Sequence, residues 1–414
     1  MYLGYLLLFV AVVGLLACAG FFGLLVLASF RFRRRGVPQI SAVCPPVTLL
    51  KPLCGLEPNL RQNIASFFDQ EYPTFEIIFG AHSLNDPALA IVEELRQRFP
   101  FVPVQVVISG EPTAANAKIC SVRKMYAVAR HDYLVISDSD VEVRPNYIRE
   151  VIAPLLDLKV GMVTCLYRGA TSGGFWSRLE ALGMSVEMTA GVLVSDLLEG
   201  MKFALGPTMA IRRDVLDSIG GFDALAAYCA DDYVLGERVA GSGNKVVLST
   251  HVIDHVVVNR KLLPSFVHQI RWMKSTRFSR PTGHVASVLS FAMPFGLLGF
   301  FTAIVVGRPG VAVGLLATAL INRILMAVVA GWGVVRDDHA LRLCWLYPVR
   351  DLMGFAFWVS SFVGNTITWR GHHYRLKLDG LMEPVWSAPA LDELIYSDVL
   401  APSVEPSLAA EQVS

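Results

Sequence analysis

The stretch Asp132-Tyr-Leu-Val-Ile-Ser-Asp-Ser-Asp140 decides the fold of this chain. Its apolar run, Tyr133–Ile136, is typical of a buried parallel strand, and Asp138 and Asp140 follow at the carboxyl end, where open α/β sheets bind ligands. Because residues two apart in extended backbone point to the same side, both carboxylates can face one hard cation, which would hold a diphosphate. The alternative is an acidic turn that caps the next helix.

Strand and helix patterns alternate on either side of this stretch, over residues 45–260. The strand patterns are Val47–Leu50, Phe75–Phe79, Val104–Ile108 and Tyr133–Ile136, and the helical patterns between them are Leu60–Phe68, Pro87–Phe99 and Ala117–Ala129. This alternation predicts a mainly parallel sheet with right-handed crossovers. The sequence has no Gly-x-x-x-x-Gly-Lys-Ser/Thr loop, and no Gly-x-Gly-x-x-Gly follows the first strand. A metal and basic side chains are therefore expected to hold any phosphate groups.

The composition indicates a protein that lies partly in a membrane. The 414 residues are 54% hydrophobic and only 17% charged, with a mean hydropathy of +0.49, which is too apolar for an ordinary soluble protein. A net charge of +1 without a basic tail gives no basis for nucleic-acid binding. The seven cysteines form no Cys-x-x-Cys pair, as expected for reduced thiols on a cytosolic face.

An uncharged segment opens the chain and predicts a transmembrane helix over residues 1–30. It is long enough to cross a bilayer of about 30 Å at about 1.5 Å per residue. Four arginines follow it, namely Arg31, Arg33, Arg34 and Arg35. The positive-inside rule then places the amino terminus outside and the 45–260 domain in the cytoplasm, as an integral membrane protein. The alternative is a cleaved leader.

The chain turns apolar again near its end, where residues 284–366 predict about three membrane segments. Their ranges are Ala286–Val306, Val311–Gly333 and Leu343–Gly364. The third contains Arg350 and Asp351, which at membrane depth must be mutually neutralised, interfacial or functional. Residues 367–414 are expected to form a basic segment and a loose tail. Three spans would place the carboxyl terminus outside, whereas the basic segment favours the cytoplasmic side.

Two more residues are candidates for contacts with a nucleotide sugar. Asp86, in Asn85-Asp-Pro87, follows the second strand, where its carboxylate can accept hydrogen bonds from a nucleobase or ribose. The alternative is an N-cap before a first-turn proline, and one residue can fill both roles. Lys118 lies at the start of the helix that leads to the Asp-x-Asp strand, so its amine can reach a diphosphate or simply be solvated. Asn116 is expected to cap that helix.

Adjacent acids, Asp231 and Asp232, precede the helical pattern Val234–Val239. Neighbouring side chains point in different directions, so at most one of them is expected to be a working group. A carboxylate that is near another acid and partly dry has a raised pKa, which suits a general base for an acceptor hydroxyl. The alternative is that both acids cap a helix N-terminus.

A helix expected over residues 261–283 carries the motif Gln269-Ile-Arg-Trp272. It has an apolar face and several basic residues, which predicts an amphipathic helix at the membrane surface. That placement does not account for Gln269, Arg271 and Trp272 at this spacing. Arg271 is a candidate to neutralise a leaving diphosphate, and Trp272 is a candidate to wall an acceptor pocket.

These motifs in this order resemble the membrane glycosyltransferases that include cellulose, hyaluronan and ceramide sugar transferases. Within that group the chain looks most like ceramide glucosyltransferases, glycosyltransferase family 21, and their bacterial relatives in hopanoid lipid synthesis. The resemblance covers residues 1 to about 380. Its carriers are Lys51-Pro-Leu-Cys-Gly-Leu-Glu57, Asn85-Asp-Pro, Asn116-Ala-Lys, Gly220-Gly-Phe222, Asp231-Asp-Tyr233 and Trp369-Arg-Gly-x-x-Tyr-Arg-Leu376.

The resemblance implies a cytosolic GT-A-like α/β domain that binds a UDP-sugar and receives a lipid acceptor from the bilayer, in a bacterial inner membrane. It assigns nucleoside contacts to Asp86, diphosphate and Mn²⁺ or Mg²⁺ to Asp138 and Asp140, and the catalytic base to Asp232. It also implies that Gln269, Arg271 and Trp272 close the site. In the animal ceramide enzymes this acidic motif lacks its last Asp, whereas Asp140 completes it here. Asp231 remains a minor rival for the base because many relatives carry Glu-Asp at this dipeptide.

The expected reaction is a single, inverting displacement that moves a hexose to a lipid hydroxyl, with UDP-glucose and ceramide as the favoured substrates. One alternative uses UDP-N-acetylglucosamine or another UDP-sugar and a hopanoid polyol. A second is a processive polysaccharide synthase, which shares every motif but needs a channel for its polymer. A third is a non-catalytic membrane scaffold.

Overall fold

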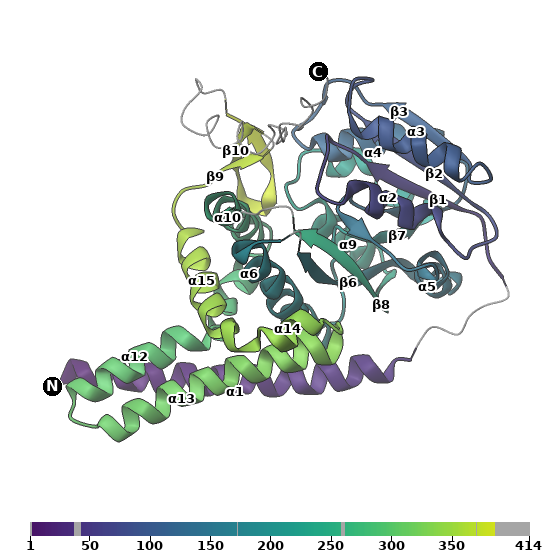
Figure 1. Ribbon diagram of the computed structural model, residues 1–414. Coiled ribbons are helices and arrows are strands. Elements are labelled where there is room, and N and C mark those ends of the chain that lie inside the picture. The colour runs from purple at the N-terminus through teal and green to yellow at the C-terminus, as the bar shows by residue number, and fades with distance from the viewer. Residues whose placement is uncertain (1, 37–42, 172, 258–260, 370, 386–414) are drawn as a thin grey trace, which may run out of the picture.

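A computed structural model describes residues 2–36, 43–171, 173–257, 261–369 and 371–385. Eight strands form its central sheet, in the order β3-β2-β1-β4-β7-β6-β8-β5 (Figure 1). Their bounds are β1 Val47–Pro52, β2 Phe75–Ala81, β3 Val104–Ile108, β4 Tyr133–Ile136, β5 Val141–Glu142, β6 Val160–Thr171, β7 Met209–Arg212 and β8 Lys245–Val257. The expected loose tail, from residue 389 onward, lies outside the described residues.

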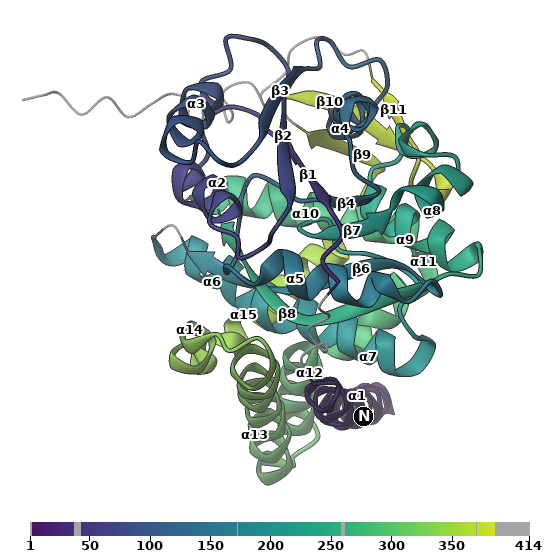
Figure 2. The same cartoon turned by 90° about the vertical axis from the view of Figure 1, so that its right-hand side faces the viewer.

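The first four strands are parallel and confirm the predicted GT-A-like α/β fold. β1 and β2 are almost wholly buried, as their apolar sequences predict, whereas the edge strand β3 is partly exposed. The crossover helices are α2 Leu60–Phe68, α3 Ala88–Arg98 and α4 Ala117–Val128. Figure 2 shows α2 and α3 on one side of these strands and α4 on the other, so both faces of the sheet are covered.

The other half of the sheet is mixed. β7 is antiparallel to both β4 and β6, β6 and β8 are parallel, and β5 is antiparallel to β8. The elements that connect these strands are α5 Tyr147–Ile152, η1 Ala153–Leu156, α6 Phe175–Gly183, η2 Met184–Met188, α7 Thr189–Glu199, α8 Arg213–Ser218, η3 Phe222–Leu225 and α9 Asp231–Gly241. Since β7 lies directly beside β4, the chain before β7 reaches the Asp138 end of β4.

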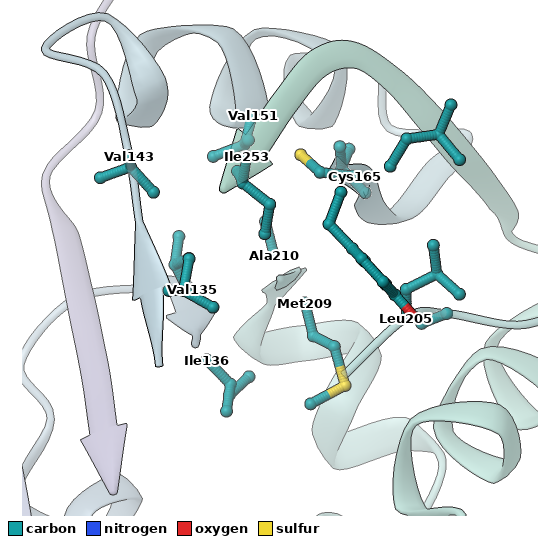
Figure 3. Packing of buried hydrophobic residues seen from close by; sticks show 14 of the residues in the cluster. Val135, Ile136, Val143, Val151, Cys165, Leu205, Met209, Ala210 and Ile253 are labelled. Atoms are coloured by element: carbon teal, nitrogen blue, oxygen red, sulfur yellow. The ribbon is translucent and has the colours of Figure 1, made fainter. Parts of the chain in front are cut away.

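One large hydrophobic core holds this sheet and extends into the helices that pack against it. Val135 and Ile136 of β4 lie among side chains from the mixed half, including Cys165, Met209 and Ile253 (Figure 3). All are buried. Apolar packing therefore fixes the end of β4, and with it the backbone from which the acidic residues Asp138 and Asp140 follow.

A long helix, α1 Tyr2–Arg34, lies along the base of the molecule beside α12 Ala292–Val305 and α13 Pro309–Met326 (Figures 1 and 2). Close packing uses small residues, because a Cβ on Gly14 would overlap Phe295 of α12. By length and composition α1 and the continuous stretch Pro309–Val334 can each cross a membrane, and α12 can do so with the preceding helical segment, from which it is bent by 52°. These helices agree with three of the expected spans. The segments that complete this region are α11 Pro281–Ala286, η4 Ser287–Ser290 and η5 Ala327–Val334.

The last predicted membrane segment, Leu343–Gly364, contains η6 Cys344–Leu346 and α15 Tyr347–Ser360. At 14 residues, α15 is about 21 Å long, which is shorter than the roughly 30 Å apolar thickness of a bilayer. Asp351 pairs with Arg323 of α13 at 3.0 Å, and Arg350 pairs with Glu187 of η2 at 2.8 Å. The two charges are thus neutralised by other helices, not by each other.

A fourth apolar helical stretch, Phe175–Glu199, also meets the length and composition of a span, yet 67% of its most apolar window is buried inside the protein. It packs beside β6, which makes it part of the domain around the central sheet. Two more helices complete this region, α10 Leu262–Ser279 and α14 Asp338–Arg342. The seven cysteines are free, as predicted.

A small antiparallel sheet follows α15, in the order β11-β10-β9. Its strands are β9 Thr366–Trp369, β10 His372–Leu376 and β11 Met382–Pro384, with η7 Leu378–Gly380 before β11. In its described residues, the basic segment that begins at residue 367 is therefore folded as far as the end of β11. In Figure 1 this sheet stands next to α10.

Candidate active site

Four parts of the chain bring their polar residues together at the carboxyl end of β4. Asp138 comes from the loop after β4, Lys118 from the first turn of α4, and Asp231 and Asp232 from the first turn of α9. Gly206 lies in the loop before β7 and supplies backbone to the same place. The sequence singled out these four side chains, and the structure places them in one group.

Lys118 joins two of the acidic motifs. Its Nζ lies 2.7 Å from Asp138 Oδ1 and 3.5 Å from Asp231 Oδ2. Burial acts to lower the pKa of Lys118, but the charges of Asp138 and Asp231 outweigh it and raise this pKa above its ordinary value. Lys118 is therefore a fixed positive charge at the end of β4 and not a solvated helix lysine.

Asp232 is held by backbone groups. Its Oδ2 accepts a hydrogen bond from Gly206 N at 2.7 Å and its Oδ1 accepts one from Tyr233 N at 2.8 Å. Burial first, and the neighbouring Asp231 second, raise the pKa of Asp232 to about 6. Asp231 instead accepts from Asn116 Nδ2 at 3.2 Å and faces Lys118. Asp232 thus has the properties expected of a general base, and Asp231 those of a buried ion-pair partner.

Gly206 allows two carboxylates to face the same small space. A Cβ at this position would lie 3.2 Å from Asp232 Oδ2 and 3.5 Å from Asp138 Oδ2. Any larger side chain would fill the gap between them. Because glycine has no side chain here, the carboxylates of Asp138 and Asp232 both lie close to the backbone at Gly206.

Asp140 has a histidine partner that the sequence did not reveal. His255 Nε2, on β8, lies 3.0 Å from Asp140 Oδ2. Burial acts to raise the pKa of Asp140. The opposing effect of His255 is larger, so the pKa of Asp140 lies below its ordinary value. Asp140 Oδ1 is buried and makes no hydrogen bond. The pair resembles the arrangement in which an outer partner orients a carboxylate and leaves one oxygen for a metal.

The fit of a divalent cation can be judged from this donor set. Within the described ranges, no three or more His, Cys, Asp or Glu side chains are grouped so as to hold a metal. Mg²⁺, however, is usually bound by one or two carboxylates plus substrate phosphates and water. Asp138 and the free oxygen of Asp140 meet that requirement, so they fit a cation that arrives with a diphosphate.

Side chains from the end of β1 and from α2 brace the loop that carries these aspartates. The fully buried Lys51 donates to the backbone oxygen of Asp138, and its Nζ lies 3.6 Å from the centre of the Phe67 ring. Burial lowers the pKa of Lys51 to about 7, against the opposing effect of the nearby acids. Asn63 Nδ2 donates to the Ser139 backbone oxygen at 3.2 Å. Lys51 stands in a motif that the sequence analysis quoted, but its contact with the aspartates needed the fold.

Asp86 and Asn116 both act as helix caps. Asp86 Oδ1 accepts from Ala88 N at 2.9 Å at the start of α3, and both its oxygens also accept from Gly55 N at 3.1 Å. The N-cap interpretation of Asp86 is thus confirmed, whereas a contact with a nucleoside stays a prediction. Asn116 caps α4 through Ile119 N at 3.1 Å, as predicted.

Gln269 and Trp272 are oriented by a buried acid on α6 that the sequence did not single out. Glu180 accepts from Ser265 Oγ and lies 2.9 Å from His268 Nδ1. Gln269 Nε2 donates to that same Ser265 Oγ at 2.9 Å, and the His268 ring lies 4.4 Å from the Trp272 ring. Glu180 is 2% exposed. An isolated glutamate in an apolar helical stretch gives no motif, which is why sequence reasoning missed it.

Arg271 of α10 faces the small sheet that follows α15. Its guanidinium carbon lies 5.6 Å from the centre of the Trp369 ring on β9. Burial raises the pKa of Cys229, the charge of Arg271 opposes this, and the charges of Asp231 and Asp232 add to it. Cys229 thus lies within electrostatic range of both motifs. The basic residues of α10 bind protein groups, such as Lys274 Nζ to Thr366 O at 3.0 Å, and a position at the membrane surface stays a prediction.

Comparisons with known proteins relate this chain to one family. The sequence profile of "Glycosyl transferase family 21" matches residues 7–382. Ceramide glucosyltransferase 1 of Caenorhabditis elegans is 26% identical over 81% of this chain and 72% of its own length, and ceramide glucosyltransferase 3 of the same organism is 24% identical over 91% and 83%. Among solved structures, the mannosyltransferase PcManGT of Pyrobaculum calidifontis, in complex with GDP-Man and Mn²⁺, superimposes with a TM-score of 0.48 at 16% identity, over 85% of this chain and 99% of that one.

Proposed function

The chain belongs to glycosyl transferase family 21, and we propose that it transfers a hexose from a UDP-sugar to a hydroxyl group of a membrane lipid. Our favoured substrates are UDP-glucose and ceramide, which give a β-glycosylceramide. Family membership makes the protein a glycosyltransferase. The nematode relatives, which are ceramide glucosyltransferases, support the sugar and the lipid.

The observation that carries the proposal is the convergence of Asp232, Asp138 and Lys118 around Gly206. Asp232, with its pKa raised to about 6, is mostly ionised at neutral pH yet basic enough to accept a proton from a lipid hydroxyl as the oxygen attacks. The attack forms the new glycosidic bond while the bond to the nucleoside diphosphate breaks. Two hydrogen bonds from backbone N–H groups fix the carboxylate for this transfer.

We assign the leaving diphosphate to the basic side chains of Lys118 and Arg271. Lys118 is 2.7 Å from Asp138 and can turn toward a bound phosphate, and Arg271 lies on α10 beside Trp369. Asp138 and Asp140 would hold Mn²⁺ or Mg²⁺ there, and such a cation supplies further neutralisation of the phosphate charge when bound. Asp86, Gln269 and Trp272 are assigned to the donor, with Asp86 on the nucleoside.

The acids in this group are consistent with a single displacement of the nucleoside diphosphate by the acceptor hydroxyl. Asp231 is engaged by Lys118 and Asn116, which leaves Asp232 as the base. One base with no nucleophilic carboxylate corresponds to one displacement, which inverts the anomeric carbon and converts an α-linked donor into a β-linked product.

The membrane helices provide the route for the acceptor. We place α1 across a bacterial inner membrane with α12 and α13 beside it, and the catalytic domain on the cytoplasmic side, where the arginines at the end of α1 are expected. A lipid hydroxyl at the inner surface is then close to α10 and α15. UDP-N-acetylglucosamine with a hopanoid polyol is our alternative substrate pair, and a processive polysaccharide synthase is our alternative enzyme.

A direct test is to incubate membranes that contain the protein with each UDP-sugar and with ceramide or a hopanoid polyol, and to identify the product by mass spectrometry. The expected product is a monohexosylceramide that forms only with UDP-glucose. Membranes from cells that lack the protein are the control. A glycosylated hopanoid would replace the favoured substrate pair by the alternative, and a water-soluble polymer as the main product would contradict lipid glycosylation.

The pH dependence of transfer tests the role of Asp232. Since its carboxylate must be ionised to accept a proton, kcat/KM for the acceptor is expected to fall about tenfold per pH unit below the pKa of about 6. Rates are measured between pH 5 and 8 at saturating donor, with circular dichroism at each pH as the control for folding. A profile that is flat down to pH 5 would exclude a base of this pKa.

A further inference from the structure

The small sheet β9–β11 contains a motif for which the proposed reaction has no use. Trp369-Arg-Gly-x-x-Tyr-Arg-Leu376 begins at the end of β9 and fills β10. The segment comes after the last membrane-side helix, α15, and returns to the catalytic half of the molecule (Figure 1). Its inner side chains, Ile367, Leu376 and Met382, pack on Cys229. The sheet therefore rests on the loop that leads to Asp231 and Asp232.

Backbone hydrogen bonds join this sheet to that loop. Cys229 N donates to Gly380 O at 3.0 Å, and Met382 N donates to Ala227 O at 2.8 Å. On the other side of the loop, Asn116 Nδ2 donates to Tyr228 O at 2.9 Å. The loop that leads to Asp232 is thus held between the small sheet and Asn116, the N-cap of α4.

The same sheet also holds α10. The Trp369 ring faces the Arg271 guanidinium, with 5.6 Å between the guanidinium carbon and the ring centre. Lys274 donates to the backbone oxygen of Thr366, and Gly380 approaches so closely that a Cβ on it would lie 2.5 Å from Ser279 Oγ. Three contacts along α10, from residue 271 to residue 279, therefore fix this helix to the sheet.

We propose that the β9–β11 sheet is a positioning element of the active site and that Trp369 is the positioning residue for Arg271. An aromatic face attracts a guanidinium and limits the directions in which it can point. Arg271 has a long side chain, and the ring limits its rotamers on the side of the small sheet, which helps to pre-organise the guanidinium toward the leaving diphosphate. This inference rests on the proposed function in one respect, which is the assignment of the diphosphate to Arg271.

The first test compares three substitutions of Trp369 that remove its aromatic ring fully or in part. Trp369→Leu and Trp369→Gln remove the aromatic face, and each is expected to weaken UDP binding and to lower kcat by about tenfold. Trp369→Phe keeps a smaller aromatic face, so its effects are expected to be about threefold or less. The matched control is Trp345→Leu, because Trp345 is 63% exposed. UDP affinity is measured by calorimetry in detergent, which needs no acceptor. If all three Trp369 variants bind UDP as tightly as the wild type, the proposal is wrong.

A double-mutant comparison separates positioning from general stability. In an Arg271→Met background, the change Trp369→Gln is expected to have no further effect on UDP affinity, because the group that Trp369 orients is gone. A full tenfold effect in that background would show that Trp369 acts through the fold and would overturn the proposal. Should the protein prove unable to transfer sugar to any lipid, the UDP affinities still decide whether Trp369 acts through Arg271.

Discussion

Replacement of Asp232 by asparagine is expected to lower the rate of sugar transfer by about 10³-fold, within the range that a positioned general base contributes. Asparagine keeps the shape of the side chain and can still accept a hydrogen bond from Gly206 N or Tyr233 N, but it cannot take a proton. UDP-sugar affinity is expected to change little, because Lys118, Asp138 and Arg271 are assigned to the donor. Steady-state rates with purified protein and a lipid acceptor measure the effect.

The stability of this variant is the control against misfolding. The folded-state pKa of Asp232, about 6, lies above its ordinary value, so the stability linked to this group is present below pH 4 and is lost as the pH rises toward 6. At pH 7 the wild type therefore holds an unfavourable charge that asparagine lacks. We expect Asp232→Asn to melt at the same temperature as the wild type or higher. Asp223→Asn, at a 72% exposed side chain, is the matched control for activity. A folded Asp232→Asn protein with wild-type rates would contradict the role of Asp232 as the base and would favour the alternative of a non-catalytic membrane scaffold.

Removal of divalent cations is expected to have the second-largest effect, a loss of transfer of about 100-fold or more, since a bound metal contributes several kcal/mol of charge stabilisation. Addition of Mn²⁺ or Mg²⁺ should restore it. Asp140→Asn is expected to show the same loss and not to be restored at ordinary cation concentrations. Mn²⁺ binding in the presence of UDP, followed by electron paramagnetic resonance, measures the site independently of turnover.

The control for this experiment lies at the other end of the same strand. Asp132 is 85% exposed and pairs weakly with Arg213, at 3.6 Å, so Asp132→Asn should keep both Mn²⁺ binding and transfer. Full activity in excess chelator, with Asp140→Asn also active, would assign the acids to Lys118 and His255 alone and would rule out the expected metal.

The parallel half of the fold could be predicted because its information is local. β1 to β4 are short apolar runs separated by amphipathic helices, and the predicted ranges match the observed ones to within about two residues of each end. Asp138 and Asp140 could be placed for the same reason, since a buried parallel strand has its ligands at its carboxyl end. That Lys118 and the acids after residue 230 lie near them followed from motif order and family resemblance.

The rest depended on contacts between distant residues. β7 pairs with β4 over a separation of more than 70 positions, and no periodicity in a single strand specifies such a partner. His255 and Glu180 are single polar residues in apolar surroundings, so nothing local marks them as neighbours of Asp140 or Gln269. The hydropathy of Leu343–Gly364 predicted a membrane segment but did not indicate that Asp351 pairs with Arg323 and Arg350 with Glu187. The small sheet escaped prediction because each of its strands is only three to five residues long.

The position of that small sheet in the chain has a consequence for biosynthesis. Translation delivers the acidic motifs and the membrane helices first, and the segment from Thr366 to Val385 emerges after them. A nascent chain already inserted in the bilayer therefore carries Asp232 and Arg271 without the strands that brace both. A chain that ends before Thr366 would therefore keep every acidic motif and lack the three strands that brace Asp232 and Arg271.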